Sequence, residues 1–164
     1  MDPSDAAVVS VRVLEEDDWS MWRAVRLQAL TEAPFAFGSK LEDWQGDGDT
    51  EARWRSRFVE VPYNAVAFIH SEPVGQVGAL VHDTATTLLI SMWVSPSARG
   101  EGVGEVLVNS VLRWSSFSGA KTVRLNVKCD NQRAISLYER QGFNVRLDIE
   151  PEDATELVMS RDLL

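Results

Sequence analysis

The sequence has few of the residues that build metal centres and cross-linked scaffolds. Its 164 residues include one cysteine, Cys129, and two histidines, His70 and His82. A single cysteine cannot form an internal disulfide, and such low thiol usage fits the reducing cytoplasm, where we expect the protein to act. The same shortage of sulfur and imidazole ligands predicts that the chain holds no metal ion.

Long apolar runs and an excess of positive charge are also missing. No stretch approaches the roughly 18 consecutive apolar residues of a membrane span, and the N-terminus "MDPSDAAVVS" lacks the basic-then-apolar order of a signal peptide. The chain has 16 Lys and Arg against 25 Asp and Glu, a formal net charge of −9. We therefore expect neither a membrane nor a nucleic acid as partner. The acidity suits a cationic partner, or serves solubility alone.

What the sequence does have is a continuous series of strand and helix patterns. No linker or repeat divides it, so residues 1–164 are predicted to form one domain. Alternating patterns predict strands at 8–14, 64–70, 74–82, 86–94, 122–127, 143–149 and 155–163, and helical periodicity predicts helices at 15–30, 50–61, 102–118 and 131–142. This order predicts an α+β domain with a mixed sheet, in which an antiparallel meander runs into a β-α-β crossover.

Apolar and aromatic residues indicate the core. The helix at 102–118 repeats apolar residues every three to four positions, at Val103, Val106, Leu107, Val111, Trp114 and Phe117. Trp22 and Trp54 fall on helix faces and are also predicted to be core. Trp44 lies in a loop rich in Gly and Asp, where it either packs locally or lines an acceptor pocket. Cys129 is expected to be a small buried residue at a strand end.

A glycine-rich turn joins the predicted strand at 86–94 to this helix. In "VSPSARGEGVG", residues 94–104, Gly100, Gly102 and Gly104 alternate with other residues after Arg99. A helix N-terminus has unpaired N–H groups, and glycines let the preceding loop bring further N–H groups to an anion. Arg99 adds a fork of donors suited to phosphate. The turn predicts a pyrophosphate site, although glycines that only relieve a tight turn would give the same pattern.

Two other phosphate motifs fit this turn less well. A Walker loop needs Lys and then Ser or Thr after its last glycine, where this chain has Glu105 and Val106. A dinucleotide fingerprint spaces its glycines G-x-G-x-x-G and places an acid after the next strand, which Asp130 could supply. Only one β-α-β crossover is predicted, so a nicotinamide-dependent oxidoreductase is kept as a minor alternative.

Two segments together resemble the GNAT N-acetyltransferase superfamily. "MWVSPSARGEGVG" is similar to its acetyl-CoA-binding motif, whose Arg/Gln-x-x-Gly-x-Gly/Ala core is matched by Arg99, Gly102 and Gly104. "NQRAISLYERQGF" is similar to its second motif, matched by Asn131, Ala134, Leu137, Tyr138, Gly142 and Phe143. The resemblance covers most of the chain. It implies a mixed, mostly antiparallel sheet of about six to seven strands, splayed centrally and flanked by about four helices.

The resemblance also assigns parts of the chain to acetyl-CoA. Residues 88–145 would form the acetyl-CoA-binding core, and residues 31–62 the variable region on the substrate side. The pantetheine arm would pair with the backbone of the splayed strand at Met92, Trp93 and Val94, and Asn131, by pattern a helix N-cap, would hydrogen-bond the arm as well. N–H groups along the turn would hold the pyrophosphate, at Arg99, Gly100, Glu101, Gly102, Val103 and Gly104.

Tyr138 occupies the position of the family's usual general acid. A phenol with a pKa of about 10 can protonate a departing thiolate, or hydrogen-bond to it, at a modest cost. The other interpretation is an aromatic packing residue with a polar tip. The general base is not evident. Candidates are Glu32, Glu42, Asp43, His82 and Asp83.

The leading hypothesis is an acyltransferase that moves acetyl from acetyl-CoA to a primary amine of a small molecule or peptide, by direct attack. A second class is a module that binds coenzyme A without catalysis. The acidic segment 42–51 could draw in a cationic acceptor, or could be a solvated loop. The acceptor stays unidentified, and the oligomeric state stays open between a monomer and the homodimer that is common in the family.

Overall fold

The predicted strands and helices all occur in the computed structural model, which describes residues 8–34, 36 and 40–164. The strands are β1 Val9–Val13, β2 Tyr63–Ile69, β3 Glu72–Val81, β4 Thr86–Val94, β5 Thr122–Lys128, β6 Asn144–Val145 and β7 Glu156–Asp162. The helices are α1 Trp19–Glu32, α2 Glu51–Glu60, α3 Val103–Phe117 and α4 Gln132–Arg140. Short 3₁₀ turns are η2 Glu16–Asp18, η3 Leu41–Trp44, η4 Gly46–Gly48 and η5 Pro96–Ala98.

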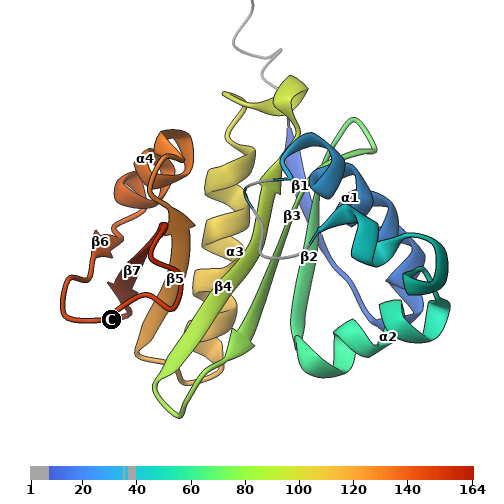
Figure 1. Cartoon of the computed structure of the whole chain (residues 1–164). Coiled ribbons are helices and arrows are strands. Elements are labelled where there is room, and N and C mark those ends of the chain that lie inside the picture. Colours follow the sequence, from blue (N-terminus) through green and yellow to red (C-terminus); the bar gives the residue numbers. More distant parts are fainter. Residues whose placement is uncertain (1–7, 35, 37–39) are drawn as a thin grey trace, which may run out of the picture.

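The strands form one mixed sheet in the order β1-β2-β3-β4-β5-β7-β6 (Figure 1). Every neighbouring pair is antiparallel except β4 and β5, which are parallel because α3 connects them as a crossover. The predicted α+β class and mostly antiparallel sheet are confirmed.

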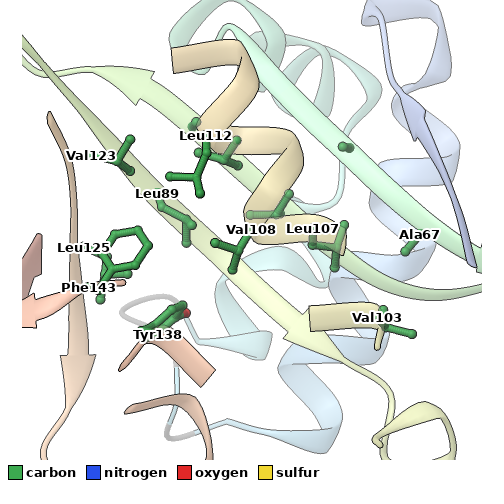
Figure 2. Close-up of a cluster of buried hydrophobic side chains, with 14 of the residues drawn as sticks. Ala67, Leu89, Val103, Leu107, Val108, Leu112, Val123, Leu125, Tyr138 and Phe143 are labelled. Carbon is green, nitrogen blue, oxygen red and sulfur yellow. The ribbon is translucent and has the colours of Figure 1, made fainter. Parts of the chain in front are cut away.

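Helices cover both faces of this sheet. Successive side chains of a strand point to opposite faces: Ala65 and Ala67 of β2 join the cluster packed on α3, whereas Val66 joins the cluster packed on α1 and α2. Figure 2 shows the α3 cluster, in which Leu107 and Val108 face the sheet. The second cluster is built around Trp22 and Trp54, each 1% exposed, which confirms both as core residues.

The central strands β4 and β5 pair only at their first residues. Thr86, Thr87 and Leu88 are in register with residues 122–124, and no pairing follows. Figure 1 shows β4 and β5 separating toward the end where α3 begins. From Leu89 to Val94, β4 therefore has a free edge on the β5 side, as the predicted central splay requires.

A bulge in β4 redirects its last residues. The register with β3 shifts between Gln76 and Gly78, and Ser91 has a positive φ of 58°. Leu89 packs on the α3 side, and a regular strand would put Trp93 on that same side. The bulge instead turns Trp93 toward α1, where it joins the second cluster.

Three local predictions are wrong. Phe117 is 94% exposed, because Ser115 takes the buried position of that turn and its Oγ lies 2.6 Å from Thr87 Oγ1. Cys129 is exposed, since it follows the last residue of β5, where the chain turns toward α4. The strand expected at 143–149 is reduced to β6, because Arg146 bonds the carboxylate two residues ahead and the chain turns away.

Candidate active site

A cleft of about 810 Å³ opens where β4 and β5 separate. Its walls come from the end of α1, the free edge of β4, the turn before α3, the end of β5 and one face of α4. Ten of the residues predicted for the site line it: Met92, Trp93, Val94, Arg99, Gly100, Gly102, Val103, Gly104, Asn131 and Tyr138. Glu101 does not, since its side chain is exposed and its N–H donates back to Ala98 O at 3.4 Å.

The glycine turn presents a row of free N–H groups to the cleft. Gly100 and Gly102 have φ values of +85° and +83°, which side chains rarely adopt, and a Cβ at either would meet open space. Within the described part of the chain, no acceptor takes the N–H of Gly100 or of residues 102–105. Five donors at a helix N-terminus form a site for an anion with several oxygens.

Gly104 has a different role from the other two glycines. A Cβ there would lie 2.7 Å from Leu137 Cδ2, so any side chain at this position would require the end of the Leu137 side chain to move. Gly104 thus gives Leu137 of α4 room to pack against the first turn of α3.

Arg99 lies beside a carboxylate from α1. Its Nη2 is 3.2 Å from Glu32 Oε1 and 3.3 Å from Oε2, and the indole N–H of Trp93 donates to Oε2 at 2.7 Å. The β4 bulge makes this contact possible, because it turns Trp93 toward α1. Glu32 and Arg99 are 30% and 27% exposed at the side chain and both line the cleft.

Tyr138 lies on α4 where the cleft meets the α3 core. Its side chain is 5% exposed and packs against Phe143, with ring centroids 5.8 Å apart (Figure 2). Burial raises the pKa of Tyr138 above its ordinary value. No described residue hydrogen-bonds its hydroxyl, so the predicted aromatic packing is present, and the role as general acid stays a prediction.

Comparison with known proteins decides the family. A model described as the acetyltransferase (GNAT) family matches residues 14–143. The chain belongs to the GNAT family. Both sequence motifs contribute lining residues to the cleft, one from the turn before α3 and its first residues, the other from α4.

Relatives match this GNAT chain over only part of its length. An uncharacterised N-acetyltransferase of Methanocaldococcus jannaschii is 29% identical over 84 residues, 48% of this chain and 37% of the relative. A mycothiol acetyltransferase of Mycobacteroides abscessus is 44% identical over 54 residues, 33% of this chain and 18% of that protein. The chain thus matches well under two thirds of the length of these relatives.

Solved structures share the fold along nearly the whole chain. The PaiA N-acetyltransferase of Thermoplasma acidophilum, in complex with coenzyme A, has a TM-score of 0.72 at 18% identity and covers 95% of this chain and 99% of its own. YncA of Salmonella typhimurium, an acetyltransferase solved with acetyl-CoA, has a TM-score of 0.70 at 17% identity, with 94% of each chain covered.

Only one of the five predicted bases lies at the GNAT cleft. Glu32 lines it, whereas Glu42 and Asp43 do not. His82 and Asp83 lie in the β3–β4 turn, at the paired end of β4 and β5. His82 Nε2 is 3.1 Å from Arg124, and the N–H of Ala85 donates to Asp83, which lowers the pKa of that carboxyl.

The acidic segment 42–51 also lies away from the cleft. None of its five acids is among the lining residues, and two of them are in ion pairs, Asp49 with Arg23 and Glu51 with Arg55. Trp44 packs against Trp54 with ring centroids 4.5 Å apart, so local packing is the interpretation that the structure favours. Residues 35 and 37–39, part of the expected substrate-side loop, lie outside the described residues.

Asn131 is confirmed as the N-cap of α4, since its Oδ1 accepts the N–H of Ala134 at 3.3 Å. Three basic residues that sequence reasoning missed also line the cleft, namely Lys128, Arg133 and Arg140. The sequence could have indicated two of them as cleft residues, because positions 133 and 140 are seven apart and share the helix face that bears Leu137.

Two features are absent from the part of the chain that the structure describes. No helix among them combines the length and apolar character needed to cross a membrane. No group of three or more His, Cys, Asp or Glu residues is arranged there to hold a metal ion.

Proposed function

We propose that this GNAT protein transfers the acetyl group of acetyl-CoA to a primary amine of a small molecule or peptide. The observation that supports it best is the row of free N–H groups at Gly100 and residues 102–105, beside a strand edge that has lost its partner. Coenzyme A needs both features: donors for a pyrophosphate and backbone groups for an extended amide arm.

The residues present fit this ligand. The N–H groups before and in the first turn of α3 would hold the pyrophosphate, with Arg99 adding charge. The free edge of β4 at residues 92–94 would pair with the pantetheine amides, as an added strand pairs with a sheet edge. Asn131, at the mouth of α4, has amide N–H donors left to bond the arm. When bound, acetyl-CoA supplies the activated acetyl thioester.

Tyr138 would act on the leaving sulfur. The raised pKa keeps its phenol protonated throughout the physiological range. Full proton transfer to a thiolate whose conjugate acid has a pKa near 8.5 is then uphill by more than about 2 kcal/mol. We infer that the Tyr138 hydroxyl stabilises the thiolate mainly by donating a hydrogen bond, with the proton following as the product leaves.

An amine-dependent thiol-release assay tests the function. Purified protein is incubated with acetyl-CoA and a panel of primary amines, including diamines, amino acids and short peptides, and products are identified by mass. We expect one thiol released for each acetylated amine. Coenzyme A binding without thiol release for any amine would favour the non-catalytic module, and absorbance titration with nicotinamide cofactors should show no binding. Cytoplasmic location and a homodimer stay predictions.

A further inference from the structure

The proposed function assigns no role to Glu32, which lines the cleft. It is the last residue of α1, where the helix dipole disfavours a negative charge. Its carboxylate nevertheless lies in the cleft between the Trp93 indole and the Arg99 guanidinium. A carboxylate held at an unfavourable helix end by two cleft residues indicates a role in the site.

The two oxygens of Glu32 have different partners. Oε2 accepts the indole N–H at 2.7 Å, from a Trp93 side chain that is 4% exposed and fixed in the second core cluster. Oε1 has Arg99 Nη2, at 3.2 Å, as its partner among the described residues. If Arg99 leaves, Oε2 stays anchored and Oε1 becomes free.

The contact between Arg99 and Glu32 is weak enough for a phosphate to replace it. Only its Nη2 contacts Glu32, at 3.2 and 3.3 Å, so the pair lacks the two-pronged geometry of a strong guanidinium–carboxylate bridge. Both side chains are about a quarter to a third exposed, and ion pairs of this kind contribute little. The free N–H groups that would hold a pyrophosphate begin at Gly100, the next residue.

We propose that the phosphates of coenzyme A bind Arg99 and so break its contact with Glu32, and that the freed Oε1 then acts as the general base for the acceptor. This inference rests on the proposed function. The acceptor's ammonium N–H bond breaks, an O–H bond forms at Oε1, and the proton passes to solvent through the exposed side of the carboxylate. The same negative charge attracts a cationic amine. Binding of coenzyme A would thus free the base that the acceptor needs.

The cleft has further charged lining residues besides Glu32. Arg99 is the charged residue in contact with it among the described residues, and Trp93 adds an uncharged donor. The remaining charged lining residues are Glu105, Lys128, Asp130, Arg133 and Arg140. Glu105 pairs with Arg140 at 3.2 Å, and Lys128 pairs with Asp153 at 2.8 Å.

The test combines coenzyme A affinity with a pH profile. Calorimetric titration of coenzyme A is made with Glu32→Gln, Arg99→Gln, the double variant and the control Glu51→Gln, which loses one charge and an exposed ion pair on α2. We expect E32Q to bind coenzyme A more tightly, by up to about five-fold, the strength of an exposed pair. R99Q should bind more weakly, and E32Q should have no effect when R99Q is already present. E51Q should match the wild type.

The pH profile tests the base. With the amine that releases thiol fastest, kcat/KM of E32Q should fall about 10²-fold near neutral pH. The deficit should shrink toward pH ~10.4, where the free amine needs no base. Weaker coenzyme A binding by E32Q would mean that Glu32 merely supports Arg99, and would refute the proposal that the phosphates displace Arg99 from Glu32. A pH profile that is the same in E32Q and the wild type would refute the role of Glu32 as general base. A wild type that binds no coenzyme A would instead refute the proposed function itself.

Discussion

The Tyr138 hydroxyl combines two properties that a donor to a departing sulfur requires. Its ring is fixed in the α3 core, which limits the positions of the oxygen, and burial keeps the phenol neutral. The sequence motif could single out the residue and suggest the proposed role, but it left open whether the ring packs in the core. Burial depends on Phe143 and on a core assembled from distant segments.

Changing Tyr138 to Phe should therefore slow the reaction with little change in binding. Loss of a positioned donor typically costs about 10²–10⁴-fold in turnover, and the ring that packs on Phe143 remains. Turnover with acetyl-CoA and coenzyme A affinity are measured together. Tyr63→Phe is the matched control, because Tyr63 stacks on Trp114, away from the cleft. Equal turnover in both variants would assign the donor role to another group.

Asp49 gives a prediction about stability and pH. Hydrogen bonds from Arg23 and from the Trp54 indole lower its pKa to about 2. Because the folded pKa lies below the unfolded value of about 3.9, the charged form stabilises the fold fully above pH ~4, and this contribution is lost as pH falls through about 2.

The melting temperatures of the wild type and of Asp49→Asn should consequently differ above pH ~4 and converge toward pH ~2. Asp47→Asn, in the same segment, removes a carboxylate that makes no ion pair with a described residue and should leave the melting temperature unchanged. A difference in melting temperature between D49N and the wild type that persists at pH ~2 would show that the charge of Asp49 does not stabilise the α1–α2 contact.

For helices and strands, the sequence predicts which elements exist and in what order better than it predicts which of their residues are buried and where each element ends. Helix α3 was placed correctly, but the apolar pattern missed Ser115, a polar residue that is buried because Thr87 satisfies its hydroxyl. The β4 bulge could not be predicted either, since Ser91 looks like an ordinary strand residue. Its consequence, the contact of Trp93 with Glu32, depends on pairing with β3.

The approach of α3 to α4 depends on Gly104. Gly104→Ala would put a Cβ 2.7 Å from Leu137 Cδ2, and we expect a cost of about 1 kcal/mol, the low end of overpacking costs, because the end of the Leu137 side chain can move. Denaturant unfolding should show that loss for G104A in the wild-type background and a smaller loss in a Leu137→Ala background, where the space is available. Equal losses in both backgrounds would contradict the close approach as the reason for the glycine.

At the scale of the whole molecule, two cores on opposite faces hold the separated strands in place. β4 contributes Leu89 to one core and Trp93 to the other, so its free edge is fixed from both sides. The sequence motifs could predict a site near α3 and α4, because both motifs are local. They could not predict which acid from the N-terminal half reaches the cleft, since Glu32 meets Arg99 across 67 positions of sequence.

The proposed binding of coenzyme A at the turn before α3 can be tested by calorimetry with a matched pair of variants. Gly102 and Gly119 both have φ near +85° and open space at the Cβ position, at opposite ends of α3, but only Gly102 lines the cleft. Changing either to Leu imposes similar backbone strain, while only the Gly102 side chain would cover the N–H donors.

We expect the wild type and Gly119→Leu to bind one coenzyme A per chain. Gly102→Leu, folded to the same extent by circular dichroism, should lose about 10²-fold or more in affinity, since covering two charge-assisted bonds costs about 1.5–3 kcal/mol each. Equal affinity of the two variants, or no binding by the wild type, would show that this turn does not hold coenzyme A.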